Sequence, residues 1–174
     1  MDVDTKLPVS LFEGKTILVT GGTGSFGGYF IDYLLDKKFK EIRVFSRDEL
    51  KQDDMRLRLQ NSKVKFYIGD VRDRSSVDDA MPGVDYVFHA AALKQVPACE
   101  FFPMQAMQTN VIGSQNVIES AISHGVSKVV SLSTDKAVYP VNALGITKAL
   151  MEKVIQSTSR KLSNGKTILA LVRY

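Results

Sequence analysis

The sequence predicts an α/β fold, a doubly wound parallel sheet of strand order 3-2-1-4-5-6 with helices on both faces. Three features of its 174 residues lead to this prediction. Short β-branched runs alternate with longer helical patterns, as in chains built from strand–helix–strand units. The runs are mostly apolar without strict alternation, which is typical of strands covered on both faces. A glycine-rich segment joins the first run to the first helical stretch, and right-handed crossovers then place helices on both faces.

The order of the elements follows from these runs and their punctuation. Strands are expected at Lys15–Thr20, Glu41–Ser46, Val64–Gly69, Val84–Ala90, Lys128–Ser133 and Lys166–Tyr174. Helices are expected near Phe26–Lys38, Glu49–Gln60, Ser75–Met81, Met104–Ser123 and Ala143–Leu162. Pro103 suits the first turn of the fourth helix and Gly125 suits its end. We expect residues 1–12 to form an irregular arm and residues 13–174 to form one domain.

Composition excludes several classes of protein. With 44% hydrophobic and 24% charged residues, the chain has the make-up of a soluble globular domain and not of a disordered one. Its single cysteine, Cys99, excludes a disulfide scaffold. No apolar run approaches the roughly 20 residues of a membrane helix, and no signal-peptide core follows Met1. We therefore expect a cytoplasmic protein with no membrane partner.

The charge balance says little about partners. Lys and Arg number 23 against 19 for Asp and Glu, a net charge of +4. The excess forms no basic run, so the sequence does not predict nucleic-acid binding. A modest positive excess suits a pocket for an anionic nucleotide, and an ordinary solvated surface explains it equally well.

A G-x-x-G-x-x-G pattern, Gly21, Gly24 and Gly27, lies between the first strand and the first helix. The first glycine permits a tight turn, the second lets the backbone approach a pyrophosphate, and the third lets the helix pack close to the strand. The helix N-terminus then offers free N–H groups to the phosphates. This pattern predicts a Rossmann-type dinucleotide site; the alternative is a turn whose glycines serve packing alone. The residues expected to bind the cofactor here are Gly21, Thr23, Gly24, Ser25, Phe26 and Gly27.

The end of the second strand indicates which dinucleotide is preferred. An NAD site usually has an acidic residue there, but Ser46 and Arg47 occupy this place. Arg47 can hold a 2′-phosphate through charge-assisted bonds of about 1.5–3 kcal/mol. We therefore expect NADP rather than NAD. The alternative is a surface arginine paired with Asp48 or Glu49.

The third strand ends in Gly69-Asp70-Val71. We expect Asp70 to accept a hydrogen bond from the adenine amino group, with Val71 beside it. The alternative for Asp70 is to cap the turn that follows.

Several motifs together resemble the extended short-chain dehydrogenase/reductases: the glycine loop, Gly69-Asp70-Val71, Ala90-Ala91-Ala92, Asn110 and Lys148. The segments FSRDELKQDDMR, FYIGDVRD, HAAALKQVPACE and STDKAVYPVNALGITKALMEKV are most similar to UDP-N-acetylglucosamine 4,6-dehydratases that invert carbon 5, in capsule and O-antigen synthesis. The resemblance begins at Phe12 and continues to the last residue. Members of that family continue for roughly as many residues again, so we expect an N-terminal part, an NADP-binding domain without its substrate domain.

The resemblance implies a redox-neutral cycle on a UDP-sugar. Hydride leaves the sugar 4-position for NADP+, and the resulting ketone acidifies the proton at carbon 5. A base removes that proton, an acid helps the 6-hydroxyl leave as water, and the hydride returns to carbon 6. Reprotonation from the opposite face inverts carbon 5.

Thr134-Asp135-Lys136 follows the fifth strand, where open parallel sheets place their ligands. Adjacent acid and base groups are what an elimination needs. The resemblance implies that Asp135 is the acid at the 6-hydroxyl and Lys136 the base at carbon 5, with Ser133 or Thr134 bonded to the 4-hydroxyl. Lys136 must then lose its proton for part of the cycle, which burial and nearby positive charge favour. The alternative is a surface turn with a weak ion pair.

Lys148 matches the lysine of the Y-x-x-x-K motif, which implies that it holds the nicotinamide ribose. The tyrosine position of that motif is Leu144, which cannot take a proton. An apolar residue at this place resembles the inverting subgroup. Lys136, Asp135, Tyr139 or a water must then receive the 4-hydroxyl proton, and for Tyr139 a packed loop position is the alternative.

The remaining polar residues near these motifs have mixed expectations. The resemblance implies that Ala90, Ala91, Ala92 and Lys94 lie at the cofactor, with a solvated loop lysine as the alternative for Lys94. We expect Asn110 to join the ends of the fourth and fifth strands. His89 and His124 show no metal-ligand spacing, so we expect both to be structural and no metal to be bound. Met104, Met107 and Met151 suit helix packing.

Three functions are consistent with the sequence: a UDP-N-acetylglucosamine 4,6-dehydratase with 5-epimerisation, an NADP-binding module without turnover, and an NADP-dependent sugar epimerase or reductase. The resemblance also implies a homo-oligomer formed through the fourth and fifth helices. Core packing explains the apolar residues of those helices as well.

Overall fold

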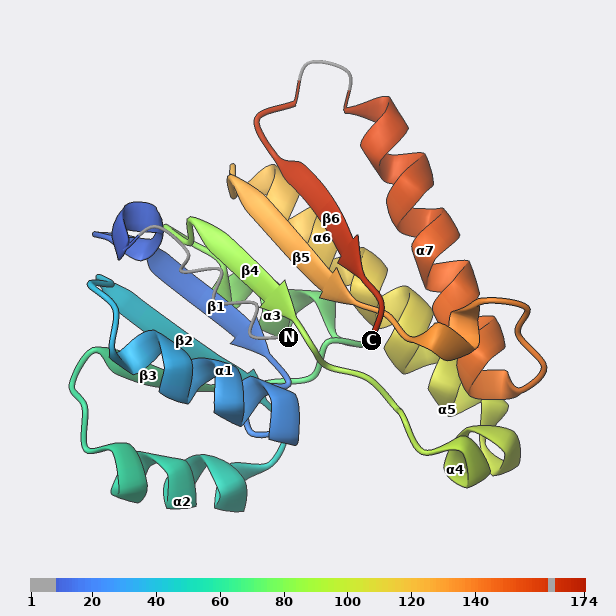
Figure 1. The fold of residues 1–174 in the computed structure, drawn as a ribbon, viewed down its shortest axis with the longest axis horizontal. Coiled ribbons are helices and arrows are strands. Elements are labelled where there is room, and N and C mark those ends of the chain that lie inside the picture. Colours follow the sequence, from blue (N-terminus) through green and yellow to red (C-terminus); the bar gives the residue numbers. More distant parts are fainter. Residues whose placement is uncertain (1–8, 163–164) are drawn as a thin grey trace, which may run out of the picture.

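Six parallel strands form one sheet in the computed structural model, which describes residues 9–162 and 165–174 (Figure 1). The strand order is β3-β2-β1-β4-β5-β6, and every neighbouring pair is parallel. This confirms the predicted doubly wound fold. The strands are β1 (Thr16–Thr20), β2 (Glu41–Ser46), β3 (Val64–Ile68), β4 (Tyr86–His89), β5 (Lys128–Leu132) and β6 (Ile168–Val172).

Helices form a layer on each face of the sheet. They are α1 (Ser25–Leu35), α2 (Glu49–Leu59), α3 (Arg74–Ala80), α4 (Val96–Phe101), α5 (Pro103–Met107), α6 (Gly113–Ser123) and α7 (Ala143–Lys161). Three short turns complete the described chain: the 3-10 helices η1 (Val9–Phe12) and η3 (Asp135–Ala137) and the π-helix η2 (Gln108–Ile112). No helix among the described residues is long and apolar enough to cross a membrane.

Two hydrophobic cores lie on opposite faces of the sheet. On one face, Ile31 of α1 and Met55 of α2 pack against β1 and β2. On the other face, Val77 of α3, Ile118 of α6 and Met151 of α7 pack against β1, β4 and β5. Burial of these apolar side chains holds each layer on the sheet. Because all six strands are parallel, their carboxyl ends meet at one edge of the sheet, between the α1–α2 layer and α4 (Figure 1).

Side-chain acceptors begin most of the longer helices. Asp48, Asp73 and Asn142 accept backbone N–H groups in the first turns of α2, α3 and α7. Such caps typically contribute about 1 kcal/mol. Helix α1 differs, because its N-cap residue is Gly24 and no side chain caps it. Its first-turn amides stay available for a ligand.

The region before α6 is more divided than the sequence predicts. One helix was expected over Met104–Ser123, but α4 precedes it and the π-helix η2 joins α5 to α6. Pro103 starts α5, as predicted for a first helical turn. The residue before a proline avoids the helical region, which separates α4 from α5 at Phe102.

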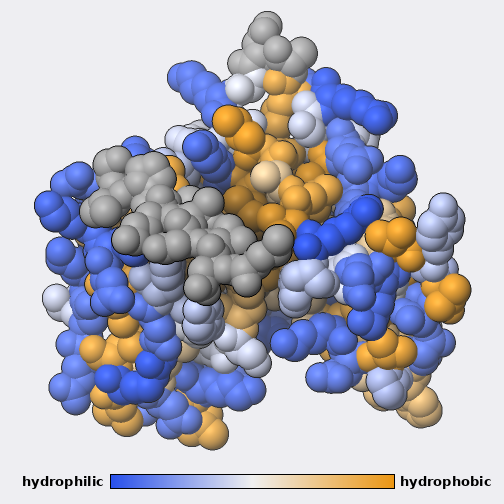
Figure 2. Space-filling model, viewed as in Figure 1, coloured by the Kyte–Doolittle hydropathy of each residue, from blue (hydrophilic) through white to orange (hydrophobic). Residues whose placement is uncertain are grey.

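Two other expectations fail at the edges of the domain. Regular structure begins inside the segment expected to be an irregular arm: η1 ends at Phe12, which is buried and packs edge-to-face on Tyr86 with ring centroids 6.4 Å apart. Residues 1–8 lie outside the described part of the chain. Strand β6 is also not covered on both faces, since Ile168 and Val172 are 59% and 45% exposed. Figure 2 shows this apolar surface over β5 and β6.

Candidate functional site

A cavity of about 740 Å³ opens at the carboxyl ends of the strands. Its size falls in the range of pockets for small molecules and cofactors. Of the residues named above as cofactor or catalytic candidates, all but Tyr139 line it. These residues are Gly21, Thr23, Gly24, Ser25, Phe26, Gly27, Ser46, Arg47, Asp70, Val71, Ala90, Ala91, Ala92, Lys94, Thr134, Asp135, Lys136 and Lys148.

The phosphate loop, residues 20–28, is built so closely that two of its glycines cannot be replaced. Gly21 has a φ of +66°, and a Cβ there would lie 2.8 Å from the Ala91 backbone nitrogen. A Cβ at Gly27 would lie 2.5 Å from the Gly21 carbonyl oxygen. The loop thus runs directly into the uncapped N-terminus of α1, the geometry that binds anions.

A buried polar chain supports this loop from behind. Thr20 Oγ1 and Ser114 Oγ each lie 2.7 Å from a ring nitrogen of His89. Burial, together with the charge of Lys148, lowers the pKa of His89 to about 3. The ring is therefore a neutral structural link at ordinary pH, and His124 bonds only to neighbouring α6 groups.

Arg47 and Asp70 face each other across the cavity mouth. Arg47 Nη1 lies 3.4 Å from Asp70 Oδ2, so Asp70, and neither Asp48 nor Glu49, is its ion-pair partner. Arg72 donates to the same Asp70 carboxylate from Nε at 2.9 Å and Nη2 at 2.6 Å. Burial opposes ionisation of Asp70, but the Arg72 hydrogen bonds hold its pKa below the usual value.

Asp70 also shows the alternative role considered for it. Its Oδ1 accepts the backbone N–H of Arg72 at 2.9 Å, and its carbonyl accepts that of Asp73. The carboxylate therefore caps the turn after β3 while lining the cavity. Both roles are compatible, because a carboxylate offers about four lone-pair positions.

The sequence analysis missed two residues of α2 that lie beside the end of β2. Lys51 lines the cavity one turn into α2 and pairs with Asp48 at 3.1 Å. Gln52 is buried and donates from Nε2 to Ser46 O, Ser46 Oγ and Tyr67 O, which fixes the strand end that carries Arg47. The position of Lys51, one turn after a strand end already suspected of binding phosphate, was the available signal.

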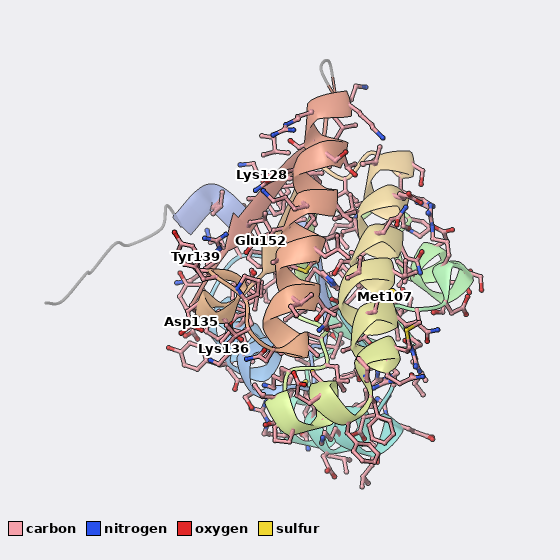
Figure 3. All side chains as sticks on the ribbon, turned by 90° about the vertical axis from the view of Figure 1, so that its right-hand side faces the viewer. Met107, Lys128, Asp135, Lys136, Tyr139 and Glu152 are labelled. Carbon is pink, nitrogen blue, oxygen red and sulfur yellow. The ribbon has the colours of Figure 1, made fainter. Side chains whose placement is uncertain are left out.

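The loop after β5, residues 133–142, carries the pair expected to perform acid–base chemistry. Lys136 Nζ lies 3.2 Å from Asp135 Oδ1, and both side chains are exposed. Thr134 Oγ1 donates to Asp135 Oδ1 at 3.0 Å. These hydrogen bonds, from Thr134 first and then Lys136, lower the pKa of Asp135. The pair therefore has the geometry of the exposed ion pair considered as the alternative (Figure 3).

The buried lysine of the site is Lys148 and not Lys136. Lys148 is 6% exposed, and its Nζ donates to the Leu132 carbonyl at 2.8 Å. Burial lowers its pKa to about 8, against an opposing effect of Glu152. The expectation that Lys136 is buried is therefore wrong, because the β5 loop leaves that side chain 49% exposed.

The residue at the tyrosine position of the Y-x-x-x-K motif is Leu144, whose side chain can neither donate nor accept a proton. Leu144 is buried against Cys99 and Ala106 and lines the cavity. Tyr139 is not placed to compensate: it is 92% exposed, has a φ of +51° and does not line the cavity. The alternative of a packed loop tyrosine is also wrong.

Tyr174 lines the cavity and was missed in the sequence analysis. Its ring stacks on Phe26 of the phosphate loop with centroids 6.3 Å apart, and its carbonyl accepts Asp135 N–H at 3.2 Å. It therefore contacts both the phosphate loop and the β5 loop. No sequence pattern reveals a contact between residues so far apart in the chain.

The remaining candidates lie around this centre. Lys94 is exposed at the cavity wall. Asn110 bonds Leu93 and Thr147, so it joins the segment after β4 to α7 rather than to the end of β5. Met151 is in the core, whereas Met104 is exposed, contrary to the expected packing role. Within residues 9–162 and 165–174, no group of three or more His, Cys, Asp or Glu side chains is placed to hold a metal ion.

A family model described as "Polysaccharide biosynthesis protein" matches residues 17–174. The chain is 60% identical over 168 residues to a UDP-glucose 4-epimerase of Rickettsia prowazekii, covering 94% of this chain and 49% of that protein. It thus spans about half the length of the curated relatives it matches.

Solved structures agree with the fold. Pen from Bacillus thuringiensis superposes with a TM-score of 0.92 at 39% identity, covering 94% of this chain and 51% of that one. DesIV from Streptomyces venezuelae, a dTDP-glucose 4,6-dehydratase solved with NAD, gives a TM-score of 0.80 at 24% identity, covering 91% and 55% of the two chains. At that identity the second match shows the fold alone.

Proposed function

Because the chain belongs to the polysaccharide biosynthesis protein family, we propose that it is the cofactor-binding part of an NADP-dependent nucleotide-sugar enzyme. Its large cavity joins the phosphate loop to the proposed acid–base pair. The proposed reaction is 4,6-dehydration of UDP-N-acetylglucosamine with inversion at carbon 5. The observation that supports it most is that Gly24, Arg47, Lys148 and the Asp135–Lys136 pair line the same cavity.

The residues of the cavity fit a dinucleotide. The loop glycines leave no room for a Cβ at Gly21 or Gly27, and α1 begins there without a side-chain cap. The amides of this first turn hold the pyrophosphate. When bound, NADP+ accepts a hydride from the sugar carbinol and later returns it. Lys148, already fixed by the Leu132 carbonyl, donates to the nicotinamide ribose.

Arg47 and Lys51 supply the preference for NADP. Both line the cavity at the end of β2, where they meet a 2′-phosphate. Arg47 is 57% exposed on its side chain and bonded to Asp70 at 3.4 Å, so it can turn to a phosphate at little cost. Asp70 keeps its Arg72 contacts and accepts the adenine amino group.

Asp135 and Lys136 perform the elimination. The Asp135 carboxylate lies 3.2 Å from the Lys136 amine, and hydrogen bonds from Thr134 and Lys136 lower the pKa of Asp135. Moving one proton along the 3.2 Å contact gives a neutral acid and a neutral amine, the two forms that the elimination needs. Asp135 then protonates the leaving 6-oxygen, and Lys136 takes the proton of carbon 5. Thr134 donates to the 4-oxygen.

Leu144 leaves the 4-hydroxyl without a phenol partner. Tyr139 is exposed and does not line the cavity, so we do not assign it this role. Lys136, Asp135 or a water bound between them receives this proton.

Product analysis in D₂O tests the proposed reaction. We would incubate UDP-N-acetylglucosamine and NADP+ with the chain, and with the chain joined to the C-terminal half of the Rickettsia prowazekii relative. The proposal predicts a 4-keto product that has lost one water, carries deuterium at carbon 5 and leaves no net NADPH. Recovery of unchanged substrate from the joined form, with NADP+ bound, would instead identify a binding module.

The second candidate is a UDP-glucose 4-epimerase, which the 60% identity to the Rickettsia prowazekii relative favours. Such an enzyme returns the hydride to carbon 4, so its product has the mass of the substrate and no deuterium at carbon 5. An NADP-dependent reductase would oxidise its cofactor. The same assay therefore separates all three reactions.

The proposed self-association rests on exposed apolar residues. Ile146 and Leu150 of α7 are 53% and 47% exposed. They lie four residues apart, on one helix face. Light scattering on the purified chain tests this: the proposal expects a dimer or larger, and Leu150→Lys should shift it towards the monomer.

A further inference from the structure

We propose that Glu152 is a positioning residue, which holds the start of the β5 loop and the end of β6 together beside Lys148. The inference rests on the proposed function, because it assigns Glu152 a purpose at that site. Glu152 does not line the cavity. It acts through the residues it binds, and it is distinct from the Asp135–Lys136 pair.

Glu152 is a buried carboxylate with three donors. It is 4% exposed; its Oε1 accepts from Ser133 Oγ at 2.5 Å and from Arg173 Nε at 2.8 Å, and its Oε2 accepts from Arg173 Nη2. The Arg173 hydrogen bond lowers the pKa of Glu152 against the opposing effect of burial. The group is therefore a fully paired anion inside the domain.

Two successive turns of α7 hold two successive residues at the end of β5. Lys148 donates to the Leu132 carbonyl at 2.8 Å, and Glu152, four residues further along the helix, accepts from Ser133. Residues four apart share one helix face. The strand end is thus attached to α7 at two points directly before Thr134 and Asp135.

The same carboxylate reaches the neighbouring strand. Arg173 follows β6, and the backbones there are joined by Ser133 N to Val172 O at 2.7 Å and Asp135 N to Tyr174 O at 3.2 Å. Glu152 closes this arrangement from the helix side, and Figure 3 shows it on α7 above the loop that carries Asp135 and Lys136. Losing Glu152 frees Ser133 and Arg173 together.

An apolar residue at position 152 would hold α7 on the sheet without the free-energy cost of burying a charge. Burying a charge requires complete pairing, and replacing a buried ion pair by apolar residues is often neutral or stabilising. The neighbours of Glu152 on this face, Met151 and Ile155, are apolar core residues. A buried carboxylate at this position is therefore explained by what it holds in place.

Glu152 also faces Lys148, whose charge it stabilises. The other ionisable groups around Lys148 are His89 on β4, which is neutral, Arg173 beside Glu152, and the Asp135–Lys136 pair beyond β5. Removing the Glu152 charge should lower the titration midpoint of Lys148, an effect that a purely structural contact does not produce.

The test uses NMR on the chain itself, with lysine side chains labelled at Cε and backbone amides labelled with ¹⁵N. In Glu152→Gln we expect a lower Lys148 midpoint, shifted or broadened Asp135 and Lys136 amide signals, and a several-fold weaker NADP+ affinity. The control is Glu119→Gln on α6, which breaks an exposed ion pair with Arg74 of α3 and should change none of these.

A second variant keeps the proposal falsifiable if Glu152→Gln does not fold. Ser133→Ala removes one bond to the β5 loop and leaves the Glu152–Arg173 pair intact; it should disturb the Asp135 and Lys136 amides while leaving the Lys148 midpoint near its original value. Unchanged loop amides in a folded variant would overturn the proposal, as would an unchanged Lys148 midpoint in folded Glu152→Gln. These signals do not depend on turnover, so failure of the proposed reaction is recognised separately.

Discussion

The two ends of the cavity are built differently. At the phosphate loop, backbone atoms meet so closely that Gly27 has no room for a side chain, and Thr20 and His89 support the loop from the core. At the β5 loop, Asp135 and Lys136 are exposed and bonded mainly to each other. The comparison shows that close backbone packing and buried hydrogen bonds fix the phosphate-loop end, whereas surface hydrogen bonds alone hold the proposed reacting pair.

The largest expected effect is at the preformed end. Gly27→Ala places a Cβ 2.5 Å from the Gly21 carbonyl, so backbone must move and the loop geometry is lost. We expect dinucleotide affinity to fall about 100-fold or more, equivalent to roughly 2.8 kcal/mol. Calorimetric titration with NADP+ measures this.

Gly28→Ala is the matched control, because a Cβ there meets only Met55 Cε at 3.7 Å, an ordinary contact. It should bind like the unaltered chain. Equal losses in the two variants would mean that helix α1, and not the loop, carries the effect.

Arg47→Ala should weaken NADP+ binding by about 10- to 100-fold and leave NAD+ binding nearly unchanged, since a charge-assisted bond contributes roughly 1.5–3 kcal/mol. Arg56→Ala, on the exposed face of α2, serves as the control because Arg56 pairs with Asp53 and does not line the cavity. An equal loss of affinity for NADP+ and NAD+ would contradict the proposed contact between Arg47 and the 2′-phosphate.

Lys148 lies between the two ends of the cavity, and we expect its titration to make both stability and cofactor affinity depend on pH. Its pKa is about 8 in the folded chain and near 10.5 when exposed, so between these values the unfolded chain binds more protons. The free energy of unfolding should therefore rise with pH across this window. NADP+ affinity should fall as pH passes 8, because the ammonium donor is lost.

Lys148→Met should flatten that rise in stability and weaken NADP+ binding by about tenfold, as expected for one charge-assisted bond. Chemical denaturation at several pH values measures the first effect. Lys153→Met, an exposed substitution on the same helix, should keep the slope of the unaltered chain; the account of Lys148 fails if both variants behave alike.

The smallest effect is expected at the exposed end. Tyr139→Phe removes only a phenol that points to solvent, so cofactor affinity and turnover of the joined form should stay within about twofold of the original, a difference below 0.5 kcal/mol. A tenfold loss of turnover would show that Tyr139 moves into the cavity and receives the 4-hydroxyl proton.

Local pattern predicted most of the fold, and it selected residues that the fold brings together around one cavity. β-branched runs and a glycine loop between a strand and a helix are signals of short range, so β1 to β6 and the residues around Gly21 and Arg47 were found from sequence. Helix α4 was missed because its six residues make fewer than two helical turns, with Pro97 inside them and Pro103 just after them.

The reacting end was less predictable because it depends on contacts between distant residues. Glu152 looks like an ordinary helix residue until Arg173 and Ser133 are placed against it. Tyr174 contacts Phe26, although the two residues lie near opposite ends of the sequence. The expected burial of Lys136 failed for the same reason, since burial is a property of packing.

A crystal structure of the chain with NADP+ tests the central claim most directly. We expect the pyrophosphate on the first-turn amides of α1, the 2′-phosphate against Arg47, and the nicotinamide ring facing Asp135 and Lys136. A cofactor bound outside the glycine loop, or a nicotinamide ring directed away from that pair, would contradict it.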